Sequence, residues 1–291
     1  MKFFKISSSY FELHFVVLLF GITGVLGKLI SLSALSLVFY RMIIAAVFLF
    51  FWLKIKKIHF RLTKRTLLIS IITGIIMALH WYFFFYAIKI STVSLVLGLL
   101  GTGTIFTSLL EPLLLRKRFS FTDLVFAIPI LIGVLLIYWG EPIQWRGLVI
   151  AILSYLLFSI FSVINKKIGF YNETLVISFW EFISGGIFMF LLTWINNDLS
   201  LPNITDSFYL LILAIGCTAY AFSALIRLMK TYSAYLVIMH VNLEPVYAII
   251  LSLIIFGESE MLSSLFYIGA AIIISSLFFY QIWYSKREKS R

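Results

Sequence analysis

Long apolar runs, separated by short stretches that carry charge or turn residues, constrain this chain most. A helix of roughly 20 apolar residues crosses the bilayer core, and such runs fill most of the 291 residues. Only 12% of the residues are charged, against about 25% in soluble domains. The sequence therefore predicts an all-α integral membrane protein. We expect about ten membrane-spanning helices, at residues 14–32, 35–53, 66–88, 92–115, 121–139, 146–165, 174–195, 207–228, 233–256 and 261–283.

Lysine and arginine residues gather in alternate connections, which predicts the orientation of the helices. With the N-terminus inside, 19 of the 23 basic residues lie on the inner side, three lie outside, and Arg41 lies within a span. Cytoplasmic loops carry such an excess. We expect a bacterial-type inner (plasma) membrane protein with both termini in the cytoplasm. The net charge of +11 then faces anionic lipid, and we expect no nucleic-acid partner.

The two halves of the sequence resemble each other. FGITGVLGKLI from Phe20 and FSIFSVINKKI from Phe158 share five of eleven positions, and KISTVSLV from Lys89 aligns with KTYSAYLV from Lys230. The offsets of 138 and 141 residues indicate a duplicated five-helix unit. Because five is odd, the second unit enters the membrane from the opposite side. We expect two inverted repeats around a central cavity, at residues 1–140 and 141–284, followed by a basic cytoplasmic tail at 285–291.

Three stretches of sequence carry a resemblance to a known family. They are GKLISLSALSLVFYRMIIAAVFLF from Gly27, the K-x-x-[ST] starts at Lys89 and Lys230, and Glu244-Pro245 followed by Gly257-Glu258. Over essentially the whole chain, as two units, the sequence resembles the EamA family of the drug/metabolite transporter superfamily. The resemblance implies ten helices, inverted repeats, a central cavity and movement of small metabolites, often amino acids or related compounds and frequently outward.

The first half departs from this family pattern late in its unit. Thr104 stands where Pro245 is expected, and Arg116-Lys117 stands where Gly257-Glu258 is expected. Glu111-Pro112 lies eight residues beyond the position that matches Glu244-Pro245, so it is not the repeat equivalent of that motif.

Polar residues at helical spacing within the spans are the first candidates for lining the cavity. A charge at the centre of a membrane helix costs roughly 2.5–3.5 kcal/mol on insertion scales, so such residues face the protein interior. In the fourth span, one face carries Thr104, Thr107, Ser108 and Glu111, preceded by Gly98, Gly101 and Gly103. The glycines permit close approach or a broken helix. This face either lines the cavity or packs against another helix through small residues.

The sixth span carries a second polar face, with Ser159 and Ser162 between Tyr155 and Lys166. Lys28 is the counterpart of Lys166 in the first span. These two lysines either hold a substrate carboxylate at the two mouths of the cavity or extend to the membrane interface, as lysines near helix ends do. Tyr220, Ser223 and Arg227 form a similar but less central face in the eighth span.

The ninth span places His240 and Glu244 one turn apart, with Asn242 and Tyr247 nearby, and Pro245 is expected to interrupt its backbone hydrogen-bond ladder. An imidazole and a carboxylate at this spacing can share a proton, as a proton-coupled carrier requires. The alternative is that the two side chains only hydrogen-bond to each other and thereby fix the packing of the helix. We retain both hypotheses for His240 and Glu244.

Arg41 lies about six residues inside the second span and, allowing for the difference between the two offsets, aligns with Trp180–Glu181 of the seventh. Either the two side chains pair as a gate between the halves, or Arg41 ties helix-end carbonyl groups together. In the third span, His80 and Trp81 either form an aromatic wall for an apolar substrate group or pack against other helices.

These features favour a secondary transporter that exports or exchanges small zwitterionic or amphipathic metabolites by alternating access. No GxxxxGK[ST] motif is present, so we expect a gradient as the energy source. A channel or facilitator is the alternative, although no filter sequence is visible. An enzyme is disfavoured because the 12 acidic residues are scattered singly. The spacing of the four histidines and Cys217 predicts no metal site, we expect no cofactor, and the oligomeric state stays open.

Overall fold

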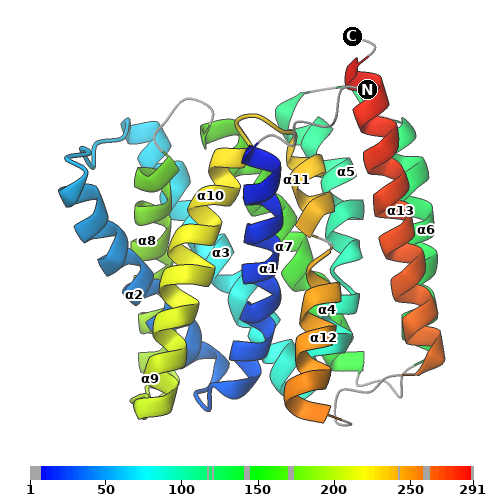
Figure 1. The fold of residues 1–291 in the computed structure, drawn as a ribbon. Helices are drawn as coiled ribbons and strands as arrows, with labels where there is room; N and C mark the ends of the chain where they lie inside the picture. Colours follow the sequence, from blue (N-terminus) through cyan, green and yellow to red (C-terminus); the bar gives the residue numbers. More distant parts are fainter. Residues whose placement is uncertain are drawn as a thin grey trace.

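The computed structural model describes residues 8–116, 118–119, 121–140, 145–169, 174–241, 243–257 and 263–289. Within these ranges every regular element is a helix (Figure 1). Lys117, Asn242 and Glu258, which the sequence analysis singled out, lie outside the described residues. The helices are α1 (Ser8–Leu29), α2 (Ala34–Ile55), α3 (Lys64–Ile90), α4 (Val93–Gly98), α5 (Gly101–Leu115), α6 (Phe121–Gly140), α7 (Trp145–Gly169), α8 (Thr174–Ile195), α9 (Ile204–Leu211), the π-helix η1 (Ile212–Tyr220), α10 (Ala221–Leu228), α11 (Ala234–Val241), α12 (Glu244–Phe256) and α13 (Ser264–Lys289).

Seven helical segments of the described chain are long and apolar enough to cross a membrane, judged by length and composition. Three shorter apolar helices accompany them, at Val125–Leu136, Glu244–Phe256 and Ser264–Tyr280. The architecture agrees with an all-α integral membrane protein. The number of ten spans stays a prediction.

Short polar side chains begin several of the helices. Ser33, Thr63, Thr92 and Asn203 each accept a hydrogen bond from the backbone N–H three residues later. Such caps satisfy N–H groups that have no partner within the helix. Ser233 does the same before α11. The K-x-x-[ST] motifs at Lys89 and Lys230 therefore place a capping residue at the start of α4 and α11.

Helix boundaries recur about 140 residues later in the chain. α2 and α8 each have 22 residues and begin at Ala34 and Thr174. Just after them, Lys57 and Asn197 both adopt positive φ, 55° and 51°. The capping residues Thr63 and Asn203 are also 140 residues apart. The same local chemistry thus starts and ends corresponding helices in both halves.

The fourth, eighth and ninth predicted spans are not uniform α-helices. The fourth breaks between Gly98 and Gly101, as its glycines allowed, and the ninth breaks between Val241 and Glu244. Pro245, in the first turn of α12, has no N–H to continue the ladder of α11. The eighth span contains η1, where the Thr218 hydroxyl donates to the carbonyl oxygen of Leu213, five residues earlier.

The packing pairs helices from the two halves (Figure 1). α2 packs against α8, α3 against α7 and α8, α1 against α12, and α5 against α7. α6 and α13 pack against each other at one side of the bundle. The start of α1 and the end of α13 lie at the same end of the bundle, and α13 continues to Lys289, so residues 285–289 of the predicted tail are helical.

Candidate functional site

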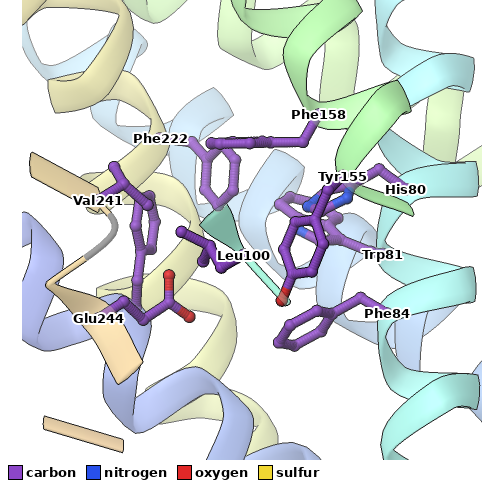
Figure 2. A pocket seen from close by; sticks show the side chains of 10 residues that line it. His80, Trp81, Phe84, Leu100, Tyr155, Phe158, Phe222, Val241 and Glu244 are labelled. Atoms are coloured by element: carbon purple, nitrogen blue, oxygen red, sulfur yellow. The ribbon is translucent and has the colours of Figure 1, made fainter. Parts of the chain in front are cut away.

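A small cavity lies inside the bundle, between helices of both halves (Figure 2). Its volume is about 30 Å³, whereas a single water molecule needs about 10–15 Å³ by this measure. The structure therefore has room for water but not for a metabolite. The cavity is lined by Phe20, His80, Trp81, Phe84, Leu100, Tyr155, Phe158, Phe222, Val241 and Glu244.

The two broken spans meet at this cavity. Leu100 lies in the break between α4 and α5, and Val241 and Glu244 flank the break between α11 and α12. The backbone N–H groups of Leu100 and Leu243 bond to carbonyl oxygens three residues earlier, so both helices tighten here. Discontinuous helices in the middle of a bundle are typical of substrate sites in secondary transporters.

Glu244 brings a carboxylate to one wall of the cavity. Figure 2 shows it turned towards the interior, with His80, Trp81 and Tyr155 on the opposite wall. The residue is only 5% exposed and accepts no hydrogen bond from the residues that the structure describes. The guanidinium of Arg41 attracts it electrostatically, although the two groups form no ion pair. The carboxylate can therefore still hydrogen-bond to a cationic group that enters the cavity.

Arg41 lies fully buried behind the aromatic wall. Its guanidinium lies 3.8 Å from the centre of the Trp81 ring. Nε donates to the Thr218 hydroxyl at 2.5 Å and Nη2 to the Cys217 carbonyl oxygen at 3.4 Å, both in η1. Nη1 has no hydrogen-bond partner in the described ranges. π-helices often mark functional positions because they turn side chains and carbonyl groups out of the regular ladder.

Hydrogen bonds fix two further walls of the cavity. His80 Nδ1 lies 2.9 Å from the carbonyl oxygen of Ser154 and 2.8 Å from its hydroxyl oxygen. The Tyr155 hydroxyl donates to the carbonyl oxygen of Val96 in α4 at 2.8 Å. These contacts hold the rings of α3 and α7 in place beside the break of the fourth span.

Arg41 and Glu181, the gate hypothesis of the sequence analysis, form no ion pair with each other. Glu181 is fully buried and accepts hydrogen bonds from Thr73 and Asn165. Arg41 is instead stacked on Trp81 and bonded to η1. The alternative hypothesis was that Arg41 binds carbonyl groups at helix ends. Arg41 does contact a carbonyl oxygen, but that of Cys217, which lies within the continuous helix formed by η1 and α10.

His240 and Glu244 do not hydrogen-bond to each other. His240 Nδ1 contacts the carbonyl oxygen of Leu236 at 2.8 Å, and its ring lies 5.3 Å from that of Tyr10 and 5.9 Å from that of His14. The break before Glu244 separates the two side chains, so the i, i+4 spacing of a continuous helix does not apply. Asn242, predicted beside them, lies outside the described residues.

Lys28 and Lys166 lie at opposite ends of the bundle and away from the cavity lining. Lys28 lies 4.5 Å from the centre of the Phe256 ring. Lys166 donates to the carbonyl oxygens of Met229 and Tyr232, just after α10. Both contacts tie a helix end to its neighbour.

The remaining predicted residues do not line the cavity. Thr104, Ser108, Glu111, Ser159 and Ser162 are buried. The Ser159 hydroxyl donates to the carbonyl oxygen of Gly103 at 2.9 Å, which joins α7 to α5, and Ser108 donates to Ile105 within its own helix. Tyr220 is 40% exposed and donates to Glu12 at 3.3 Å, beside the Glu12–Arg227 ion pair.

The polar pattern alone did not identify several cavity residues. Phe20 and Phe158 both line the cavity, and each opens one copy of the repeated FGITGVLGKLI-like stretch. Their equivalence in the repeat was the available signal. Leu100, Phe84 and Phe222 carry no such mark, because an apolar residue in a membrane helix looks the same whether it faces a cavity, another helix or lipid.

Comparison with known proteins gives a family and a fold. The model of the EamA-like transporter family matches residues 9–139 and again residues 145–281. One solved crystal structure is similar with a TM-score of 0.73 and 15% sequence identity, over 97% of this chain and 99% of the other. At that identity the likeness concerns the fold alone. A search of curated proteins finds no match.

Proposed function

This chain belongs to the EamA-like transporter family, and we propose that it is a secondary transporter which exports or exchanges small zwitterionic or amphipathic metabolites. One observation carries the proposal. The cavity lies where two broken helices meet, and it combines the Glu244 carboxylate with a wall of aromatic rings backed by Arg41. We infer that this cavity is the substrate site.

The cavity chemistry suits a molecule with a cationic group and an apolar part. An ammonium group would meet the Glu244 carboxylate and the faces of Trp81 and Tyr155, which attract cations. An apolar group would pack on Phe20, Phe158 and Phe222 from the same lining. A substrate carboxylate would be drawn towards Arg41, whose Nη1 lacks a protein partner.

Alternating access between two inverted repeats accounts for how such a molecule would cross. Helix boundaries repeat after 140 residues, and the α1–α12 contact has its counterpart in the α7–α5 contact. Lys28 and its repeat partner Lys166 lie at opposite ends of the bundle. A cavity of about 30 Å³ suits a closed intermediate, so we propose that helices separate at one end or the other to admit substrate.

Counterflow in proteoliposomes tests the proposal. The purified protein is reconstituted with unlabelled amino acids inside, and uptake of a panel of labelled amino acids and their amines is measured. We expect uptake of an amine-bearing substrate that depends on internal substrate. Flux that needs no internal substrate would instead indicate a channel, and absence of flux for the whole panel would contradict the proposed substrate class.

Glu244→Gln tests the role of the cavity acid. Because the amide keeps the shape and loses the charge, we expect the KM for an amine-bearing substrate to rise at least tenfold, equivalent to about 1.4 kcal/mol. Glu12→Gln, which removes an acid outside the cavity, is the matched control and should leave KM within about twofold. An unchanged KM in Glu244→Gln would remove this residue from the substrate site.

A further inference from the structure

A second buried carboxylate lies outside the cavity. Glu181 sits where α8 meets α3 and α7, and it is fully buried. Both of its donors use the same oxygen: the Thr73 hydroxyl lies 2.7 Å and the Asn165 amide nitrogen 2.8 Å from Oε1. Oε2 has no hydrogen-bond partner among the residues that the structure describes. A buried carboxylate oxygen without a donor is costly while the group is charged.

No cation compensates this charge among the described residues. The basic groups on the elements around α8 are engaged or placed elsewhere. From α2, Arg41 is bonded to Thr218 and stacked on Trp81. Arg227 of α10 pairs with Glu12. Arg65 of α3 and Lys166 and Lys167 of α7 lie at helix ends, and His80 of α3 is bonded to Ser154.

A groove reaches from one end of the bundle to Thr73, which is hydrogen-bonded to this carboxylate. It has a volume of about 620 Å³ and lies between α3, α5 and α7. Most of its lining is apolar, but Thr63, Arg65 and Lys167 lie towards its outer end and Thr73 lies at its inner end. Since Thr73 is itself a donor to Glu181, water in the groove would need to pass only one hydroxyl to reach the carboxyl group.

The surrounding groups can hydrogen-bond either form of the carboxyl group. Asn165 Oδ1 is buried and, within the described part of the chain, has no hydrogen-bond partner. When Glu181 is charged, the Asn165 amide nitrogen donates to it, as observed. When Glu181 is protonated, rotation of the amide would present Oδ1 as an acceptor for the new O–H. The Thr73 hydroxyl also lies 2.9 Å from the carbonyl oxygen of Ile69 and can turn to it.

We propose that Glu181 is the proton-binding site of this protein and that the groove is its path to the end of the bundle where α3 begins. Glu244, which has Arg41 as its electrostatic partner, then serves substrate and not proton binding. We propose that α3 couples proton binding at Glu181 to substrate binding in the cavity. Thr73, which contacts Glu181, and His80, which lines the cavity, lie two turns apart on this helix. The role in coupling rests on the proposed function, whereas proton binding does not.

Infrared difference spectroscopy of the purified protein tests proton binding without any transport. Spectra are recorded as pH is changed, and the carbonyl band of a protonated carboxyl group is followed. We expect one such band to disappear in Glu181→Gln, to shift in Glu181→Asp and to remain in Glu244→Gln. A band that persists in Glu181→Gln, or one that disappears only in Glu244→Gln, would overturn the assignment.

Transport assays then test the coupling. With Glu181→Gln we expect counterflow at equal pH to stay within about threefold of wild type, while uptake driven by a pH gradient is lost. Uptake still driven by the gradient would overturn the role of Glu181 in coupling. If the wild-type protein itself shows no counterflow, the proposed transport function is contradicted, whereas the infrared assignment of Glu181 still stands.

Discussion

Arg41 and Glu181 occupy corresponding residues of α2 and α8, 140 positions apart, and both are fully buried. Each hydrogen-bonds to a threonine in the third helical segment of the other half: Arg41 to Thr218, and Glu181 to Thr73. In each half a threonine hydroxyl thus serves as the partner of a buried ionisable side chain from the other half, a guanidinium in one case and a carboxyl group in the other. Arg41 also has the Trp81 ring 3.8 Å from its guanidinium, and the face of such a ring attracts a cation.

The stacking of Arg41 on Trp81 gives a prediction for substrate affinity. Arg41→Lys keeps a positive charge but loses the planar group that stacks on the ring and donates to Thr218. Loss of a desolvated cation–π contact is worth about 2 kcal/mol. We therefore expect counterflow at low substrate concentration to fall at least tenfold. Arg227→Lys, at the exposed ion pair with Glu12, is the control, and equal transport by both variants would contradict the prediction.

The Tyr155 hydroxyl gives a prediction for stability. Tyr155→Phe removes the donor to Val96 and leaves a buried carbonyl oxygen without that bond. The Val96 oxygen keeps the Leu99 N–H as a donor, so the loss of one hydrogen bond costs about 0.5–1.5 kcal/mol. We therefore expect a lower melting temperature in detergent. Tyr267→Phe, at a 40% exposed position on α13, is the control. A melting temperature equal to wild type in Tyr155→Phe would show that this bond does not support the structure.

At the scale of single residues, the sequence identified His80, Trp81 and Glu244, which the structure brings to the cavity. It misplaced the relation of His240 to Glu244 because helical spacing was applied across a break in the helix. The Arg41–Glu181 pairing failed for another reason. Alignment of repeats finds residues in equivalent places, and equivalent places in a duplicated fold need not be in contact.

Helix starts and breaks could be predicted where the local sequence contains capping residues or glycines. Capping residues begin α2, α3, α4 and α9, and the glycines of the fourth span mark its break. Pro245 predicted an interruption of the ninth span, and the structure has it between Val241 and Glu244. The π-helix was not predicted. Apolar runs give the length of a span, but they do not reveal whether backbone hydrogen bonds skip three, four or five residues within it.

The contact of α3 with α8 gives a prediction at this scale. A Cβ atom on Gly74 would lie 2.8 Å from the Cα atom of Glu181, so the two backbones could not keep their present distance. We expect Gly74→Ala to lower the melting temperature by several degrees and Gly74→Val to prevent stable expression. Gly216→Ala is the control, because no atom lies within 4 Å of its Cβ position. Similar effects of Gly74→Ala and Gly216→Ala would contradict close packing here.

The whole molecule combines a repeat in sequence with pairing of helices from the two halves. The family model matches once in each half, and helix boundaries recur at the same interval. Sequence could indicate this duplication because caps, turns and lysines are retained locally. It could not indicate which helices touch, since the contacts of α2 with α8 and of α6 with α13 join segments far apart in the chain.

Alternating access predicts that either end of the bundle must open during transport. Lys28 contacts Phe256 at one end, and Lys166 contacts the Tyr232 backbone at the other. Cysteine pairs at 28 and 256, or at 166 and 232, joined by a short bifunctional thiol reagent, should each stop counterflow. The native Cys217 is buried, so background labelling should be low. Single-cysteine variants treated alike should keep at least half of their activity. Full counterflow by either cross-linked protein would mean that substrate crosses without separation of that end.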